Sequence, residues 1–157
     1  MPYLFDGNNL LGSWGGPRQH DDRRPEVVRR VAEFCRLKNV KATIVFDGHP
    51  LRGDLAQQQI GNVTLRVPPE GVDADTIIRE LLDRAPRPKE LIVVSSDKEL
   101  FSYARTMGAS TLRAHEWNAL ERQLLAQKQN VPGAEKPEHE DDLEGWMKKF
   151  GQTDEDR

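Results

Sequence analysis

The chain has 157 residues, of which 36% are hydrophobic and 31% are charged, and its formal net charge is -3. This length allows one domain with a sizeable core plus a tail. The negative charge argues against tight, constitutive binding of bulk nucleic acid, which depends on neutralising phosphates. The single cysteine, Cys35, excludes an intramolecular disulfide, and no apolar run reaches the ~20 residues of a membrane span. Because the start of the chain also lacks the layout of a signal peptide, we expect a cytoplasmic protein with no membrane contact.

Strand and helix patterns alternate along most of the chain. Short apolar or β-branched runs bounded by turn residues predict five strands, at Tyr3–Phe5, Ala42–Phe46, Val63–Val67, Leu91–Val94 and Ser110–Leu112. Apolar residues at helical spacing predict four helices, at Pro25–Lys38, Ala74–Arg84, Lys98–Met107 and about His115–Gln129. Strands separated by helices need right-handed crossovers, so the pattern predicts a three-layer α/β domain over residues 1–128 with a mainly parallel five-stranded sheet.

Three finer expectations follow from the same patterns. Leu91–Val94 is the most apolar strand and is expected at the centre of the sheet. In the last helix, the apolar residues are expected to pack, namely Trp117, Leu120, Leu124 and Leu125. Arg29 and Arg30 in the first expected helix are interpreted as a solvated charged face.

The composition changes after Asn130 to proline, glycine and charge, with one apolar island at helical spacing. The island consists of Leu143, Trp146, Met147 and Phe150. We therefore expect residues 129–157 to form a charged linker followed by a short amphipathic tail. Such a tail is typical of a segment that docks on its own domain or on a protein partner.

Aspartates follow three of the predicted strands. Asp6, Asp47 and Asp97 come after apolar strands, and Asp73 and Asp75 begin the helix that follows another strand. The carboxyl ends of parallel strands meet at one edge of a sheet, so we expect these carboxylates to lie together. Hard divalent cations such as Mg²⁺ bind through carboxylate oxygens and waters. Two such ions can activate a water and stabilise the leaving oxygen of a phosphodiester.

Each acid also has a purely structural interpretation. Asp97 and Asp73 can cap the helices that follow them, and Asp47 with Gly48 forms a common turn pair. Asp6 is harder to explain in this way, because no helix is expected directly after it. Taken jointly, the acids favour a metal site over coincidence, with Asp47 at its rim.

Three short motifs carry a resemblance to a known family: Asp6-Gly7-Asn8-Asn9, Gly71-Val72-Asp73-Ala74-Asp75, and Ser95-Ser96-Asp97-Lys98-Glu99-Leu100. In this order they resemble the NYN domain of PIN-like ribonucleases, and most of all its bacterial YacP-like branch. The resemblance covers about residues 2–115, and the acidic tail is similar to tails of that branch. It implies a PIN-like (Rossmann-like) sheet and metal-dependent endonucleolytic cleavage of RNA.

Site residues follow from the resemblance by position. It implies that Asp6, Asp75 and Asp97 bind Mg²⁺ or Mn²⁺ and act in catalysis, with Asp73 as the alternative to Asp75. Asn8 is implied to orient a ligand or the substrate. Many NYN domains have a second aspartate where this chain has Glu99, a longer acid that can reach a metal through water.

Substrate contacts are expected from two loops. Trp14 either stacks on an unpaired base or packs in the core, and the two interpretations stay equal. Arg18 and Arg52 are the candidates for holding phosphate. Histidines at ligand spacing are missing, which argues against zinc.

Two functions remain as hypotheses. The first is a metal-dependent endoribonuclease acting on single-stranded RNA, with mRNA on the ribosome as one setting. The alternative is a non-catalytic RNA- or ribosome-binding module on the same fold, which is favoured by Glu99 in place of aspartate and by the tail.

Overall fold

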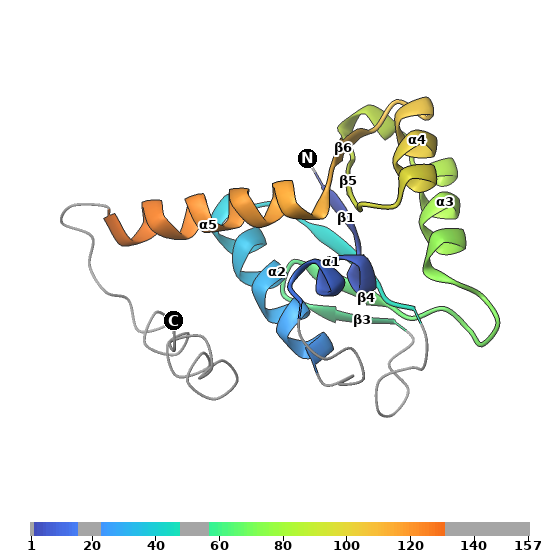
Figure 1. Cartoon of the computed structure of the whole chain (residues 1–157). Helices are drawn as coiled ribbons and strands as arrows, with labels where there is room; N and C mark the ends of the chain where they lie inside the picture. The colour runs from blue at the N-terminus through green and yellow to red at the C-terminus, as the bar shows by residue number, and fades with distance from the viewer. Residues whose placement is uncertain (1, 16–22, 48–56, 131–157) are drawn as a thin grey trace. The chain divides into compact units, whose positions relative to one another are not determined.

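The computed structural model describes residues 2–15, 23–47 and 57–130 (Figure 1). The chain divides into two compact units, Met1–Leu124 and Leu125–Arg157. Arg18, Arg52 and the expected tail lie outside the described residues, and the expected domain boundary after residue 128 stays a prediction. Within the described ranges, no helix is long and apolar enough to cross a membrane.

The described strands form one sheet of six in the order β3-β4-β2-β1-β5-β6. Their bounds are β1 Tyr3–Asp6, β2 Ala42–Val45, β3 Gln57–Ile60, β4 Val63–Arg66, β5 Ile92–Val94 and β6 Ser110–Leu112. Strand β3 runs antiparallel to β4, and all other neighbours are parallel. The α/β class and the mainly parallel sheet are therefore confirmed.

Two expectations about the sheet were wrong. The structure has a sixth strand because β3, with the sequence Gln-Gln-Gln-Ile, pairs at the sheet edge, where a strand needs no apolar alternation to form. The middle of the sheet is held by β1 and β2, and β5 lies one place further out. High apolarity marks β5 because both of its faces are covered, which is true of any inner strand of a parallel sheet.

Helices cover both faces of this sheet, as Figure 1 shows. Their bounds are α1 Gly7–Ser13, α2 Arg24–Lys38, α3 Ala74–Arg84, α4 Lys98–Thr106 and α5 Ala114–Asn130, with a short 3₁₀ turn, η2, at Pro88–Glu90. Alternate residues of β1 point to opposite layers. Phe5 packs in the cluster with residues of α1, α2 and α5, whereas Leu4 packs in the cluster with α3 and α4.

Helix α5 begins with a buried contact and then becomes more exposed. The Trp117 ring is fully buried and lies edge-on to Phe5 and Phe34, with ring centres 5.2 and 5.1 Å away. Leu120 is 38% exposed. The expectation that Leu120 packs was therefore wrong, whereas Leu124 is partly buried and packs against the core as expected.

Helix α1 begins directly after β1, with no intervening loop. A Cβ at Gly7 would lie 2.6 Å from the Phe46 ring and 3.0 Å from the Ile44 side chain. Only glycine allows the first turn of α1 to lie this close to the end of β2. The missing side chain at Gly7 thereby holds the residues that follow it against the sheet.

Candidate active site

Asp6 lies at the carboxyl end of β1 and is the N-cap of α1. Its Oδ1 accepts a hydrogen bond from the Asn9 backbone N–H at 3.4 Å, and its Oδ2 accepts one from Ser95 Oγ at 3.3 Å. The expectation that no helix follows Asp6 directly was wrong. Asp6 thus has a local structural role as well as its place at the strand end.

The environment of Asp6 shifts the protonation equilibrium of its carboxyl toward the neutral form. Burial raises the pKa of this carboxyl from its usual 3.8 to about 6, although the bonds from Asn9 and Ser95 act in the opposite direction. The charges of Asp47 and Asp97 raise the pKa further. The ends of β2 and β5 therefore bring Asp47 and Asp97 within electrostatic reach of Asp6, as expected from the position of β1 between these two strands.

Asp97 follows β5 and is the N-cap of α4. Its Oδ1 accepts hydrogen bonds from the backbone N–H groups of Glu99 at 2.9 Å and Leu100 at 3.1 Å. Ser95, which is buried, connects this acid to Asp6, because Ser95 Oγ accepts from the Asp97 N–H at 3.1 Å and donates to Asp6. Sequence reasoning missed this role of Ser95, although a small polar residue at the end of an apolar strand was the available signal.

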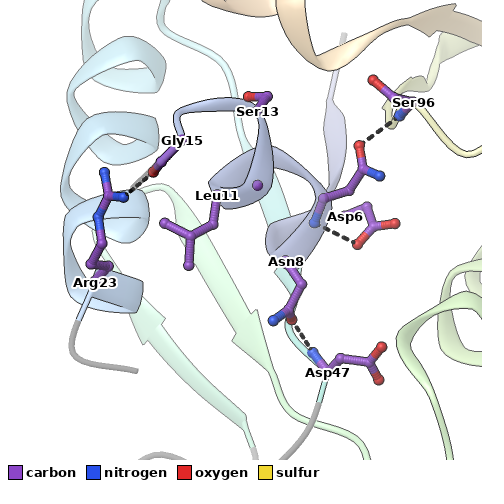
Figure 2. A pocket seen from close by; sticks show the side chains of 10 residues that line it. Asp6, Asn8, Leu11, Ser13, Gly15, Arg23, Asp47 and Ser96 are labelled. Atoms are coloured by element: carbon purple, nitrogen blue, oxygen red, sulfur yellow. Dashed lines mark hydrogen bonds between the residues drawn. The ribbon is translucent and has the colours of Figure 1, made fainter. Parts of the chain in front are cut away.

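Two consecutive amides of α1 connect the neighbouring strand ends. Asn8 Oδ1 accepts from the backbone N–H of Asp47, and Asn9 Oδ1 accepts from that of Ser96 at 2.7 Å (Figure 2). The first bond holds the chain after β2, and the second holds the chain after β5. Asn9 was not among the predicted site residues, even though it belongs to the same motif as Asn8.

Further bonds extend this arrangement to the next helices. Asp47 accepts from the backbone N–H of Ala74, the first residue of α3, at 3.0 Å. Ser96 Oγ accepts from that of Ala114, the first residue of α5, at 3.1 Å. Asp47 is therefore more than a rim acid, since it positions the start of α3 relative to β2.

Asp73 and Asp75 differ sharply although they are two residues apart. Asp73 is exposed and caps α3 by accepting from the Thr76 backbone N–H and Thr76 Oγ1, bonds that hold the pKa of its carboxyl below the usual range. Asp75 pairs through Oδ2 with Arg79 at 2.8 Å. Its Oδ1 is buried and has no hydrogen-bond partner among the described residues.

The described part of the chain contains no group of three or more His, Cys, Asp or Glu side chains that could hold a metal ion. The donor chemistry nevertheless suits a hard divalent cation, because every candidate is a carboxylate oxygen. Asp75 Oδ1 is a buried oxygen without a partner, and Asp6 faces two further acids. Glu99 lies exposed in the first turn of α4, beside Asp97.

A cavity of about 650 Å³ opens beside Asp6. It is lined by Asp6, Asn8, Asn9, Leu11, Gly12, Ser13, Gly15, Arg23, Asp47 and Ser96. Figure 2 shows Leu11 between Arg23 on one side and Asp6 with Asp47 on the other. Arg23 donates to the Gly15 carbonyl and, through Nε, to Glu26 at 3.4 Å, which holds the guanidinium at this wall of the cavity.

Trp14 packs at the end of α1. Its Nε1–H donates to Asn118 Oδ1 at 2.9 Å, and the Arg30 guanidinium lies 3.9 Å from its ring centre. Arg30 in turn pairs with the buried Glu121, so its interpretation as a solvated residue was wrong. Stacking of a base on this ring face would have to displace Arg30. A role of Trp14 in RNA binding stays a prediction.

Comparisons with known proteins agree with this fold. The model of the YacP-like NYN domain matches residues 3–151, which confirms the resemblance. Two solved structures of Rae1 (YacP) from Bacillus subtilis, one of them a point mutant, have TM-scores of 0.66 and 0.67. They are 21% and 19% identical to this chain, and the matches cover 82% of it and 78% and 79% of those chains. No curated protein matches significantly.

Proposed function

The chain belongs to the YacP-like NYN domain family, a nuclease-like, RNA-related family, and on that premise we propose that it is a metal-dependent endoribonuclease acting on single-stranded RNA. The observation that carries the proposal is that Asp47 and Asp97, which follow neighbouring strands of the sheet, both lie near enough to Asp6 to raise the pKa of its carboxyl. Converging carboxylates are typical of phosphodiester hydrolysis by a metal-activated water, which needs no nucleophilic side chain.

The proposed cofactor is Mg²⁺ or Mn²⁺. Asp6 and Asp97 would hold it together with Asp75, whose buried Oδ1 has no hydrogen-bond partner among the described residues. Asp73 remains the alternative to Asp75, although its oxygen already accepts two bonds from Thr76. Glu99 would act through water. When bound, such a cation lowers the pKa of a water molecule and stabilises negative charge on the phosphate.

The chain's own residues keep the acids in position. Ser95 bridges Asp6 and Asp97 with a single hydroxyl. Asn8 and Asn9 hold the ends of β2 and β5 beside α1. These bonds would hold the strand ends, and with them Asp6 and Asp97, in place before substrate binds.

Cleavage of a fluorescent oligoribonucleotide tests the proposal. The wild-type protein should cut it with Mg²⁺ or Mn²⁺ and not with EDTA. Asp97→Asn should lower the rate more than about 100-fold, because even residues that only support a metal ligand typically cost 10- to 100-fold. Asparagine caps helices as well as aspartate, so α4 should stay folded.

Glu80→Gln is the matched control, since Glu80 is exposed on α3 and does not line the cavity. It should cut at the wild-type rate. Equal cutting by the wild-type protein and Asp97→Asn would overturn the assignment.

A second candidate is a non-catalytic RNA- or ribosome-binding module. The observation in its favour is that the described residues contain no assembled group of three acids. RNA or ribosome binding that survives both Asp6→Asn and Asp97→Asn, without any cleavage, would support it. Cleavage by the wild-type protein that either substitution abolishes would exclude it. Ribosomal mRNA as a target and a cytoplasmic setting remain parts of the proposal.

A further inference from the structure

The cavity beside Asp6 carries opposite charges on its two sides. Asp6 and Asp47 lie on one side, and Arg23 lies on the other, with Leu11 between them (Figure 2). The Arg23 guanidinium is held there by the Gly15 carbonyl and by Glu26. A ligand that fills this space must place an anionic group near Arg23 and an apolar or neutral part over Leu11.

Gly12 leaves the floor of the cavity open. It lies in the last turn of α1, and a Cβ built on it would have no atom within 4 Å. Glycine inside a helix is unfavourable relative to alanine by about 1 kcal/mol. Gly12 therefore costs helix stability without relieving any steric conflict within the described residues, in contrast to Gly7, whose Cβ would collide with Phe46.

An RNA strand has the features that this cavity requires. Successive phosphates are joined through one sugar, which carries the base as a side group, so a phosphate at the acids would place the adjoining sugar over Leu11 and Gly12 and the next phosphate toward Arg23. The volume of about 650 Å³ lies in the range of small-ligand sites. Unpaired nucleotides are the form in which proteins reach RNA bases and sugars individually.

We propose that this cavity is the subsite for the nucleotide next to the cleaved bond of single-stranded RNA. Arg23 contacts the neighbouring phosphate, and Gly12 provides the space for the sugar. This inference rests on the proposed function for the identity of the bond that is cut. The subsite itself can be tested by binding alone.

The first test fills the cavity from its floor. Gly12→Leu should keep the wild-type melting temperature or exceed it, because the new side chain enters open space. It should weaken binding of a short fluorescein-labelled oligouridylate, measured by anisotropy in EDTA at low salt, by about tenfold or more, the equivalent of 1.4 kcal/mol. Gly12→Ala should give a smaller loss.

Gln123→Leu is the control for Gly12→Leu. It adds an apolar side chain at an exposed position of α5 that does not line the cavity. Its binding should equal that of the wild-type protein. Wild-type affinity in Gly12→Leu would overturn the subsite.

The second test counts phosphate contacts. A plot of the logarithm of the binding constant against the logarithm of the salt concentration has a negative slope. Arg23→Gln should make this slope less negative by about 0.7, the value for one phosphate contact on a single strand. Arg87→Gln is the control, because Arg87 is exposed and lies just before η2, near the opposite end of β5. An unchanged slope in Arg23→Gln would exclude Arg23 as a phosphate contact.

Failure of the subsite and failure of the nuclease proposal give different results. If the wild-type protein binds the oligouridylate without ever cutting it, and Gly12→Leu no longer binds it, the subsite is supported and the nuclease proposal is excluded. If the protein cuts and Gly12→Leu binds and cuts equally well, the subsite falls alone. A wild-type protein that neither binds nor cuts the strand overturns both.

Discussion

The end of β1 and the start of α3 use an aspartate for the same local purpose and hold it in opposite environments. Asp6 and Asp73 each cap a helix through a side-chain oxygen. Burial and two neighbouring acids raise the pKa of Asp6 to about 6, whereas bonds from Thr76 hold the pKa of the exposed Asp73 below its usual range. Capping is thus compatible with either environment, and the pKa values of the two carboxyls shift in opposite directions because their surroundings differ.

The largest expected effect separates the two acids of α3. Asp75→Asn should lower metal-dependent RNA cleavage more than about 100-fold, as expected for a ligand rather than a supporting residue. Asp73→Asn should leave the rate within about threefold, because asparagine preserves the cap. Single-turnover cleavage with saturating Mn²⁺ measures both. The reverse order of the two losses would assign the ligand to Asp73.

The next effect concerns the pH dependence of stability at Asp6. Its folded-state pKa of about 6 lies above the usual 3.8, so the folded protein binds the proton more tightly than the unfolded chain. Stability is therefore lost as pH rises through this window. Asp6→Asn stays neutral and keeps the cap, so the metal-free variant should be more stable than wild type by about 3 kcal/mol at pH 7.

Urea unfolding in EDTA at a series of pH values measures this difference. The advantage of Asp6→Asn should shrink between pH 6 and 4 and be absent below the unfolded pKa. Asp73→Asn is the matched comparison and should show no such gain. A constant difference across all pH values would mean that ionisation of Asp6 is not its cause.

The smallest effect isolates the cap itself. Asp73→Ala removes both bonds from Thr76 and should destabilise the protein by about 1 kcal/mol, the usual cost of losing a cap. RNA cleavage by the folded protein should not change. Thermal unfolding and a cleavage assay below the melting temperature give the two values. A large loss of cleavage with unchanged stability would give Asp73 a role beyond capping.

Local patterns predicted the regular parts of the fold. The expected bounds Ala74–Arg84 match α3, and Asp73 and Asp97 cap helices, which was the structural alternative to a metal site, because capping and helical spacing are local properties of the chain. Helix α1 could not be predicted in this way. It has only seven residues, including two glycines and two asparagines, and packing at Gly7 holds it in place. Tertiary contact here outweighs poor helix propensity.

The candidate site was also predicted only in part from the sequence. Asp6 and Asp97 were placed together because the topology of parallel strands brings their ends to one edge. Ser95 and Asn9 were missed as site residues because each bonds to a residue distant in sequence, Ser95 to Asp6 and Asn9 to Ser96. Arg23 was missed as well. One arginine among several in the same stretch carries no signal that it faces a cavity. Arg30, its neighbour in that stretch, instead pairs with Glu121 on α5.

The missing side chain at Gly7 determines how freely Asp6 and the asparagines that follow it can move. Because α1 starts directly after β1 and lies on Phe46, no hinge separates Asp6 from the asparagines that follow it. A displacement of α1 must therefore deform the sheet or open the core beneath it. Asp6, Asn8 and Asn9 share the rigidity of the hydrophobic interior, so a loss of packing at Phe46 would reach these polar groups before it unfolded any helix.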